Sequence, residues 1–174
     1  MAAKDPVALI VLEAMEDLLQ AVDGTGDWNF DLSGTGVVQI GEILPKMRDP
    51  SVSNGRRVVI GPMQFGTLPQ ESNLFRDAMT MGVYVYAGAG IVADYPNRAK
   101  ALLRLTHDIT RALAFKALRD QVNTLESGKA NNTLIAIRRF DGDISGLKEH
   151  DLGGTAFLFS LDYRTPNRGV TGGI

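Results

Sequence analysis

The sequence has no cysteine and only two histidines among its 174 residues. The missing cysteines exclude disulfides, thiolate nucleophiles, cysteine-ligated zinc ribbons and iron–sulfur clusters. The charges nearly cancel, because 18 Lys and Arg stand against 20 Asp and Glu and leave a formal net charge of -2. A chain without a strong positive field is not expected to attract nucleic acid or an anionic membrane through bulk electrostatics.

Long apolar runs are also missing. No segment approaches the roughly 18 to 20 apolar residues that a helix needs to cross a bilayer. Residues 1–19 carry acids through their apolar stretch, where a signal peptide would not. We therefore expect an intracellular or virion-type soluble protein. The length and the 44% hydrophobic content fit one domain that buries about 70% of its unfolded surface.

Two segments carry the periodicity of an amphipathic helix. In residues 7–22, apolar residues recur at steps of three and four, while the acids Glu13, Glu16 and Asp17 point elsewhere. Residues 99–113 show the same spacing and predict the longest helix, with a helical piece at 115–125 that continues it or bends from it. The polar face of the longest helix is predicted to hold Lys100, Arg104, Asp108 and Arg111.

Strands are predicted from β-branched and aromatic residues and from alternation. The segments are 57–61, which ends at Pro62, then 81–86, 133–140 and 155–163. The residues predicted to share one face of the last strand are Phe157, Phe159, Leu161 and Tyr163. Segments 28–32 and 37–40, separated by turn residues, predict a short hairpin. No element is assigned to residues 63–72.

The strands occur in runs and do not alternate with helices. This order predicts an α+β fold with a small mixed or antiparallel sheet, whose one face is covered by the N-terminal helix and the long helix. We expect a single domain over residues 1–164. Residues 165–174 are rich in glycine and turn residues and are predicted to form a flexible C-terminal tail.

Residues 88–93, Gly-Ala-Gly-Ile-Val-Ala, fit the G-x-G-x-x-G/A pattern of dinucleotide-binding turns. Such a site needs a helix N-terminus beside the glycines to bind the pyrophosphate. Pro96 instead predicts a helix that starts about six residues after Gly90. The acid expected about 20 residues later, Asp108, falls inside that helix. We expect a strand-to-helix loop, and a nucleotide-binding enzyme that uses Gly88 and Gly90 is the alternative.

The other motifs that could carry chemistry are incomplete. Residues 141–146 match the start of an EF-hand loop, but its twelfth position is Leu152 in place of glutamate. The pair His107-Asp108 is typical of HD hydrolases, which need further His and Asp ligands. The sequence contains neither a G-x-S-x-G elbow nor a P-loop. We therefore expect no catalytic residue, no cofactor and no bound metal.

The order of the predicted elements resembles that of the tail terminator, or tail completion, proteins of long-tailed bacteriophages. The resemblance covers roughly residues 7–164: an N-terminal helix, a small sheet, a long helix after the central strand, a strand ending in Arg-Arg-Phe, and an aromatic last strand. It implies a non-enzymatic protomer that forms a ring, commonly a hexamer, at the head-proximal end of the tail tube. There the ring would end tube polymerisation and join the tail to the neck. Glycine-rich loops at 23–36 and 61–72 depart from the shortest members and leave another neck or tail-tube role open.

The partners that this resemblance implies are other copies of the chain, the tail tube protein, the neck or head–tail connector proteins and the tail sheath. Genome DNA would pass through the ring without sequence-specific contacts, and no membrane would be involved. The protein would lie in the virion, after assembly in the host cytoplasm. We predict contacts through the paired arginines beside strands, the loop at 61–72 and the C-terminal tail. The predicted contact residues are Arg56, Arg57, Gln64, Phe65, Leu68, Arg138, Arg139, Arg168, Val170 and Ile174.

Overall fold

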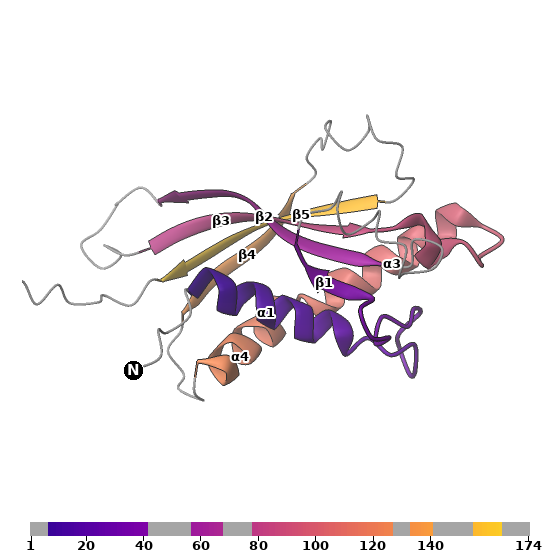
Figure 1. Ribbon diagram of the computed structural model, residues 1–174, viewed down its shortest axis with the longest axis horizontal. Helices are drawn as coiled ribbons and strands as arrows, with labels where there is room; N and C mark the ends of the chain where they lie inside the picture. Colours follow the sequence, from indigo (N-terminus) through magenta and orange to yellow (C-terminus); the bar gives the residue numbers. More distant parts are fainter. Residues whose placement is uncertain (1–6, 42–56, 68–77, 127–132, 141–154, 165–174) are drawn as a thin grey trace, which may run out of the picture.

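The computed structural model describes residues 7–41, 57–67, 78–126, 133–140 and 155–164. Within these ranges, five strands form one mixed sheet in the order β1-β2-β3-β5-β4 (Figure 1). The strands are β1 (Val38–Ile40), β2 (Val58–Thr67), β3 (Ala78–Ala87), β4 (Leu134–Phe140) and β5 (Thr155–Arg164). β1 runs parallel to β2, and the other neighbouring strands are antiparallel.

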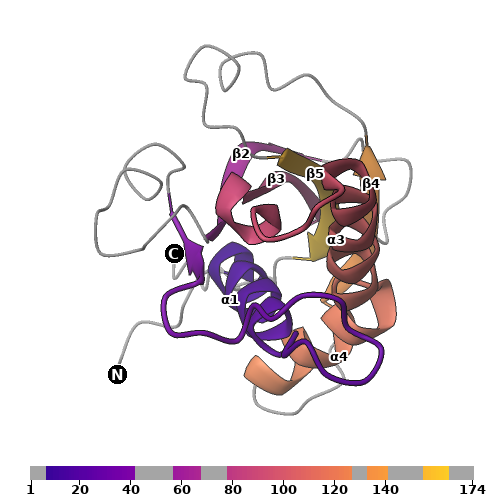
Figure 2. The ribbon, with the colours of Figure 1, turned by 90° about the vertical axis from the view of Figure 1, so that its right-hand side faces the viewer.

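Three helices lie together on one face of this sheet, as both views of the ribbon show (Figures 1 and 2): α1 (Val7–Gln20), α3 (Arg98–Ala112) and α4 (Phe115–Leu125). The 3-10 helix η3 (Ala89–Val92) follows β3 at the end of the sheet (Figure 1). The predicted α+β fold, with the N-terminal helix and the long helix on one face, is therefore confirmed. Among the helices of the described ranges, none combines the length and hydropathy that crossing a bilayer requires.

The core lies between the helices and the sheet. Alternate residues of β5 point into it, as predicted, and all four are buried: Phe157, Phe159, Leu161 and Tyr163. Apolar residues of α1, α3 and α4, spaced at three and four, meet them from the other side. The Asn97 side chain caps α3 by accepting a hydrogen bond from the Lys100 amide at 3.0 Å.

The predicted hairpin of residues 28–32 and 37–40 is wrong. Val38–Ile40 does form a strand, but it pairs in parallel with β2. Residues 28–32 bury Phe30 and Leu32, so their apolar alternation is real. Their backbone makes only one isolated bridge of the β type, between Asp23 and Asp31, because the neighbouring amides are bound to a carboxylate on α3.

The second strand does not end at Pro62, contrary to the prediction, but continues to Thr67. The pairing with β3 shifts by one residue between Pro62 and Gln64, which forms an irregularity in the ladder. A bulge tolerates proline, because the residue there need not donate a hydrogen bond to the neighbouring strand. Gly61–Thr67 is therefore strand and not loop, and the two strands form a long ribbon at one end of the sheet (Figure 1).

Gly61 lies in a crowded place on the face of the sheet that points away from the helices. The Tyr84 side chain crosses over it and donates a hydrogen bond to the Gly41 carbonyl at 2.9 Å. A Cβ at position 61 would collide with the Tyr84 hydroxyl group and would lie 2.7 Å from the Gly41 oxygen. Glycine is thus needed here for space, so that Tyr84 can connect the middle of the sheet to the end of β1.

Candidate interaction surface

A buried carboxylate on α3, that of Asp108, binds the segment that follows α1. Asp108 has no solvent exposure, and its oxygens accept hydrogen bonds from the Asn29 backbone amide (2.8 Å), the Asn29 side-chain amide (2.8 Å) and the Phe30 backbone amide (3.0 Å). Three donors directed at one carboxylate offset the cost of burying its charge. We call this arrangement the Asp108 clamp. It fixes residues 27–30 against a helix about 80 positions further along the chain.

Further contacts hold the same segment. The Tyr95 hydroxyl donates to the Asn29 carbonyl at 2.9 Å, and the Tyr95 ring lies 4.9 Å from that of Phe30. Arg111 forms an ion pair with Asp27 at 3.1 Å and lies 4.7 Å above the Trp28 ring. This loop, predicted to be a glycine-rich insertion, is thus packed against α3.

The exposed face of α3 carries cations around a leucine. Lys100, Arg104 and Arg111 share this face because they are spaced at four and seven residues, and His107 lies between them. Leu103, on the same side, is 70% exposed. Asp108 is the only acid within Arg98–Ala112, and it is buried, so the exposed face of this helix has no negative charge.

The edge strand β4 adds to this surface. Its two arginines point to opposite faces of the sheet, as neighbours on a strand do. Arg138 forms a 2.8 Å ion pair with buried Asp162, which also accepts from Thr80. Arg139 reaches the Thr110 hydroxyl of α3 at 3.4 Å and lies over the Phe157 ring. We define the basic surface as the exposed residues Lys100, Leu103, Arg104, His107, Arg111 and Arg139.

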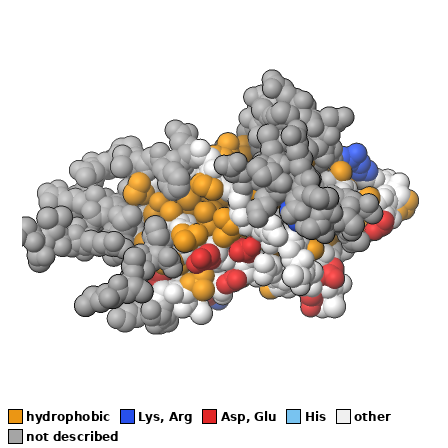
Figure 3. Space-filling model, viewed as in Figure 1, with side chains coloured by type: hydrophobic (Ala, Val, Ile, Leu, Met, Phe, Trp, Pro, Cys, Tyr) orange, Lys and Arg blue, Asp and Glu red, His pale blue; other side chains and the backbone are white. Residues whose placement is uncertain are grey.

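α1 presents the opposite charge. Glu13, Glu16 and Asp17 lie on its solvent side, and Val7–Gln20 contains no lysine or arginine. Figure 3 shows acidic side chains gathered in the middle of this face of the molecule, next to hydrophobic ones. Leu9, half-buried, lies one turn before Glu13 on the same side of the helix. We define the acidic surface as Leu9, Glu13, Glu16 and Asp17.

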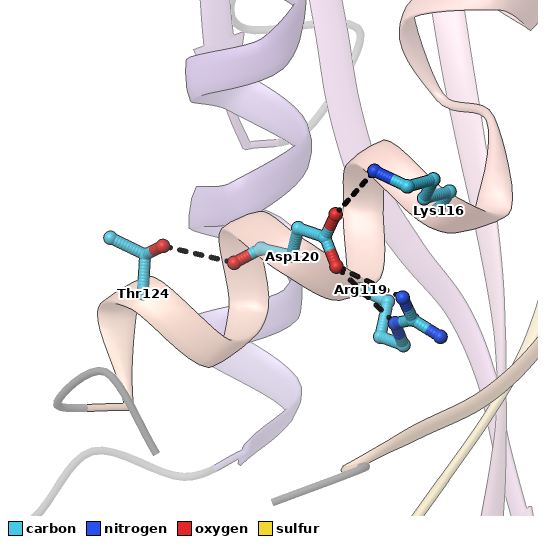
Figure 4. A network of polar contacts seen from close by, with 4 residues as sticks. All are labelled: Lys116, Arg119, Asp120 and Thr124. Atoms are coloured by element: carbon cyan, nitrogen blue, oxygen red, sulfur yellow. Dashed lines mark hydrogen bonds and ion pairs between the residues drawn. The ribbon is translucent and has the colours of Figure 1, made fainter. Parts of the chain in front are cut away.

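The charges of α4 are mostly paired within that helix (Figure 4). The Asp120 carboxylate accepts hydrogen bonds from Lys116 at 3.1 Å and from Arg119 at 3.1 and 3.3 Å. The bond from Lys116, followed by that from Arg119, lowers the pKa of Asp120 below its usual value. All three side chains are exposed or half-exposed, so this network is a solvated helix surface of small energetic weight.

The structure separates the predicted contact residues. Arg138 and Arg139 lie on an exposed edge strand, whereas the Arg57 side chain is only 1% exposed and does not reach the surface. Gln64 and Phe65 belong to β2, where their backbones pair with Gly82 and Met81. The predicted contact residues outside the described ranges are Arg56, Leu68, Arg168, Val170 and Ile174.

Three backbone amides in and after the glycine turn that follows β3 donate hydrogen bonds to backbone carbonyls of the protein. The amide of Gly88 donates to the Arg57 carbonyl at 2.8 Å, and the amides of Ile91 and Ala93 donate to Gly88 and Gly90 at 3.1 and 3.4 Å. The turn leads into η3, and α3 begins only at Arg98. The strand-to-helix loop that we predicted is present, without a long helix N-terminus beside the glycines.

The pair His107-Asp108 is split between solvent and core, because His107 is exposed and Asp108 is held in the clamp. Within the described ranges, no three His, Asp or Glu side chains gather as metal ligands would. The EF-hand-like segment 141–146 and the residues 149–151 lie outside those ranges.

Sequence reasoning placed Asp108 on the polar face of α3 together with the cations, and that placement is wrong. The helical spacing alone puts it there, but the segment at 27–30 covers it. The basic surface could have been found from sequence, since Lys100, Arg104 and Arg111 repeat at helical spacing without an intervening acid other than Asp108.

Comparisons with models of known protein families and with curated proteins find no match to this chain.

Proposed function

We propose that this protein is a structural virion protein of the tail terminator type. Copies of the chain form a ring at the head-proximal end of a phage tail tube, where the ring ends tube polymerisation and joins the tail to the neck. In this role the protein catalyses no reaction and uses no cofactor. Its partners are other copies of itself, the tail tube protein and the neck or connector proteins, with the sheath as a further partner in a contractile tail.

The observation that carries the proposal is the basic surface. Leu103 is 70% exposed between charged neighbours on α3, and Arg139 of an edge strand contacts the same helix, so this surface offers an apolar residue with a charged rim to a protein partner. An edge strand that carries charge is also protected against uncontrolled pairing with other strands. The order of elements in the described parts, from α1 through the sheet and α3 to the aromatic β5, supports the same family.

Size-exclusion chromatography with light scattering, followed by electron microscopy, tests this function. We expect a concentration-dependent species of defined copy number that appears as a ring with a central channel. Co-expression with a tail tube protein of the same phage should give tubes that carry a disc at one end and stop growing. A chain that remains monomeric at every concentration and leaves the tubes uncapped would refute the proposal.

One exposed leucine provides a sharper variant. Leu103→Glu replaces the exposed apolar side chain of the basic surface with an acid. Because this removes the apolar contact, the variant should need a higher protein concentration for assembly. Leu125→Glu is the matched control, because Leu125 is 39% exposed at the end of α4, outside that surface. Both variants should keep the circular dichroism spectrum of the parent. Equal effects of the two changes on assembly would count against the basic surface as the contact.

A further inference from the structure

We propose that the basic surface of one copy binds the acidic surface on α1 of the next copy, so that the chain assembles head to tail. This inference rests on the proposed ring function and names the two surfaces that form its repeated contact. The occupant of the basic surface is thus a second copy of this chain.

The two surfaces lie on opposite sides of the helical layer. In Figure 2, α1 lies to the left of α3, and the face seen in Figure 3, with its acidic side chains, corresponds to that left-hand side. A contact between two different patches is heterologous, so each copy that joins leaves one patch of each kind open. Repetition of such a contact by a fixed rotation produces a ring when the rotation closes.

The charges on the two surfaces are complementary. The exposed face of α3 carries three cations, of which Arg111 is paired with Asp27 and the other two are Lys100 and Arg104, whereas α1 carries three acids and no cation. Neither Lys100 nor Arg104 forms an ion pair within the described parts of the chain. The formal net charge of -2 for the whole chain does not reveal that cations lie on one surface and acids on another. This separation of charge would steer copies toward the head-to-tail orientation.

Each surface also has an apolar residue among its charges. Leu103 stands 70% exposed beside Arg104, and half-buried Leu9 lies one turn from Glu13. Apolar contact between such residues gives the interface a core, and the surrounding ion pairs set orientation and specificity. A nucleic acid would match the cations of the basic surface, but it would not bury Leu103 against an apolar residue and would not contact the acidic surface.

Charge reversal tests the pairing. Arg104→Glu and Glu13→Lys should each raise the protein concentration needed for assembly by at least about tenfold, because each places like charges opposite one another. The double variant, Arg104→Glu with Glu13→Lys, should assemble within about threefold of the parent, since the pair is restored in reverse order. A variant that merely misfolds would not be rescued in this way. Lys116→Glu, a charge reversal outside both surfaces, is the control and should assemble like the parent.

Mixing separates a head-to-tail contact from other arrangements. Arg104→Glu keeps the acidic surface and Glu13→Lys keeps the basic one, so an equimolar mixture should assemble although neither variant does so alone, with parental contacts alternating with contacts in which the charges are exchanged. Rings that persist in both single variants would overturn the pairing while leaving the proposed function intact. A parent chain that stays monomeric would overturn both. An Arg104→Glu variant that assembles normally but loses the parent's binding to a short DNA duplex would assign the basic surface to nucleic acid and refute the proposal.

Discussion

Replacing Asp108 with alanine should release the segment at residues 27–30 from α3. The change removes a carboxylate that accepts three hydrogen bonds, two of them from consecutive backbone amides. Hydrogen bonds to a charged group contribute about 1.5 to 3 kcal/mol each, and losses at neighbouring donors overlap. We therefore expect the free energy of unfolding to fall by about 3 to 5 kcal/mol, a large part of the stability of a typical domain.

The single tryptophan of the chain makes this effect visible locally. Trp28 lies in the released segment, next to Arg111, so its fluorescence reports on the clamp, while far-ultraviolet circular dichroism reports on the whole fold. In the parent, both signals should change together as urea is added. In Asp108→Ala, the Trp28 emission should shift to longer wavelength at lower urea than the circular dichroism changes, because the segment detaches first.

Asp27→Asn is the matched control. It removes an acid of the same segment, but one whose ion pair with Arg111 is exposed to solvent, with 80% of the Asp27 side chain accessible. Such a pair contributes at most about 1 kcal/mol. Equal losses of stability in Asp108→Ala and Asp27→Asn, with the Trp28 emission unchanged in both, would refute the role given to the clamp.

Two further predictions concern the sheet and α4. Gly61→Ala should lower the free energy of unfolding by about 2 to 3 kcal/mol in urea titrations, because the added methyl group collides with Tyr84 in a packed region; an unchanged midpoint would contradict that packing. Lys116→Met should raise the pKa of Asp120 in a carboxyl-carbon NMR titration, since it removes the main stabilising bond to the carboxylate. Because the folded-state pKa of Asp120 is lowered, its contribution to stability is present above the usual aspartate pKa and is lost as the pH falls through the lowered value. An Asp120 pKa that does not move in Lys116→Met would contradict the network in Figure 4.

The periodicity of apolar residues in the sequence correctly predicted the helices and strands that pack against the core through an apolar face. In α1 and α3 the three-and-four spacing corresponds to a buried side, and in β5 the alternation of Phe157, Phe159, Leu161 and Tyr163 corresponds to the core face. These patterns are local, and burial of one face follows from the sequence wherever the apolar residues line up. The order of the elements was therefore sufficient for the α+β class.

The wrong predictions concern segments whose backbone conformation depends on residues far away in the sequence. Residues 28–32 alternate like a strand, but the amides of Asn29 and Phe30 bind a carboxylate 79 and 78 positions away. The same distance hides the burial of Asp108, which helical spacing alone places in solvent. Pro62 suggested a strand end, and the shift of register beside it lets β2 continue. No property of the local sequence contains this information.

The mass of the assembled protein tests the central claim most directly. Light scattering across a chromatographic peak should give a single species at an integral multiple of the 18.8 kDa chain, about 113 kDa for a ring of six copies. Raising the salt concentration from about 0.1 M to about 0.5 M should shift that species toward monomer, because the contact joins surfaces of opposite charge. A mass of 18.8 kDa at every concentration and at low salt would contradict the account.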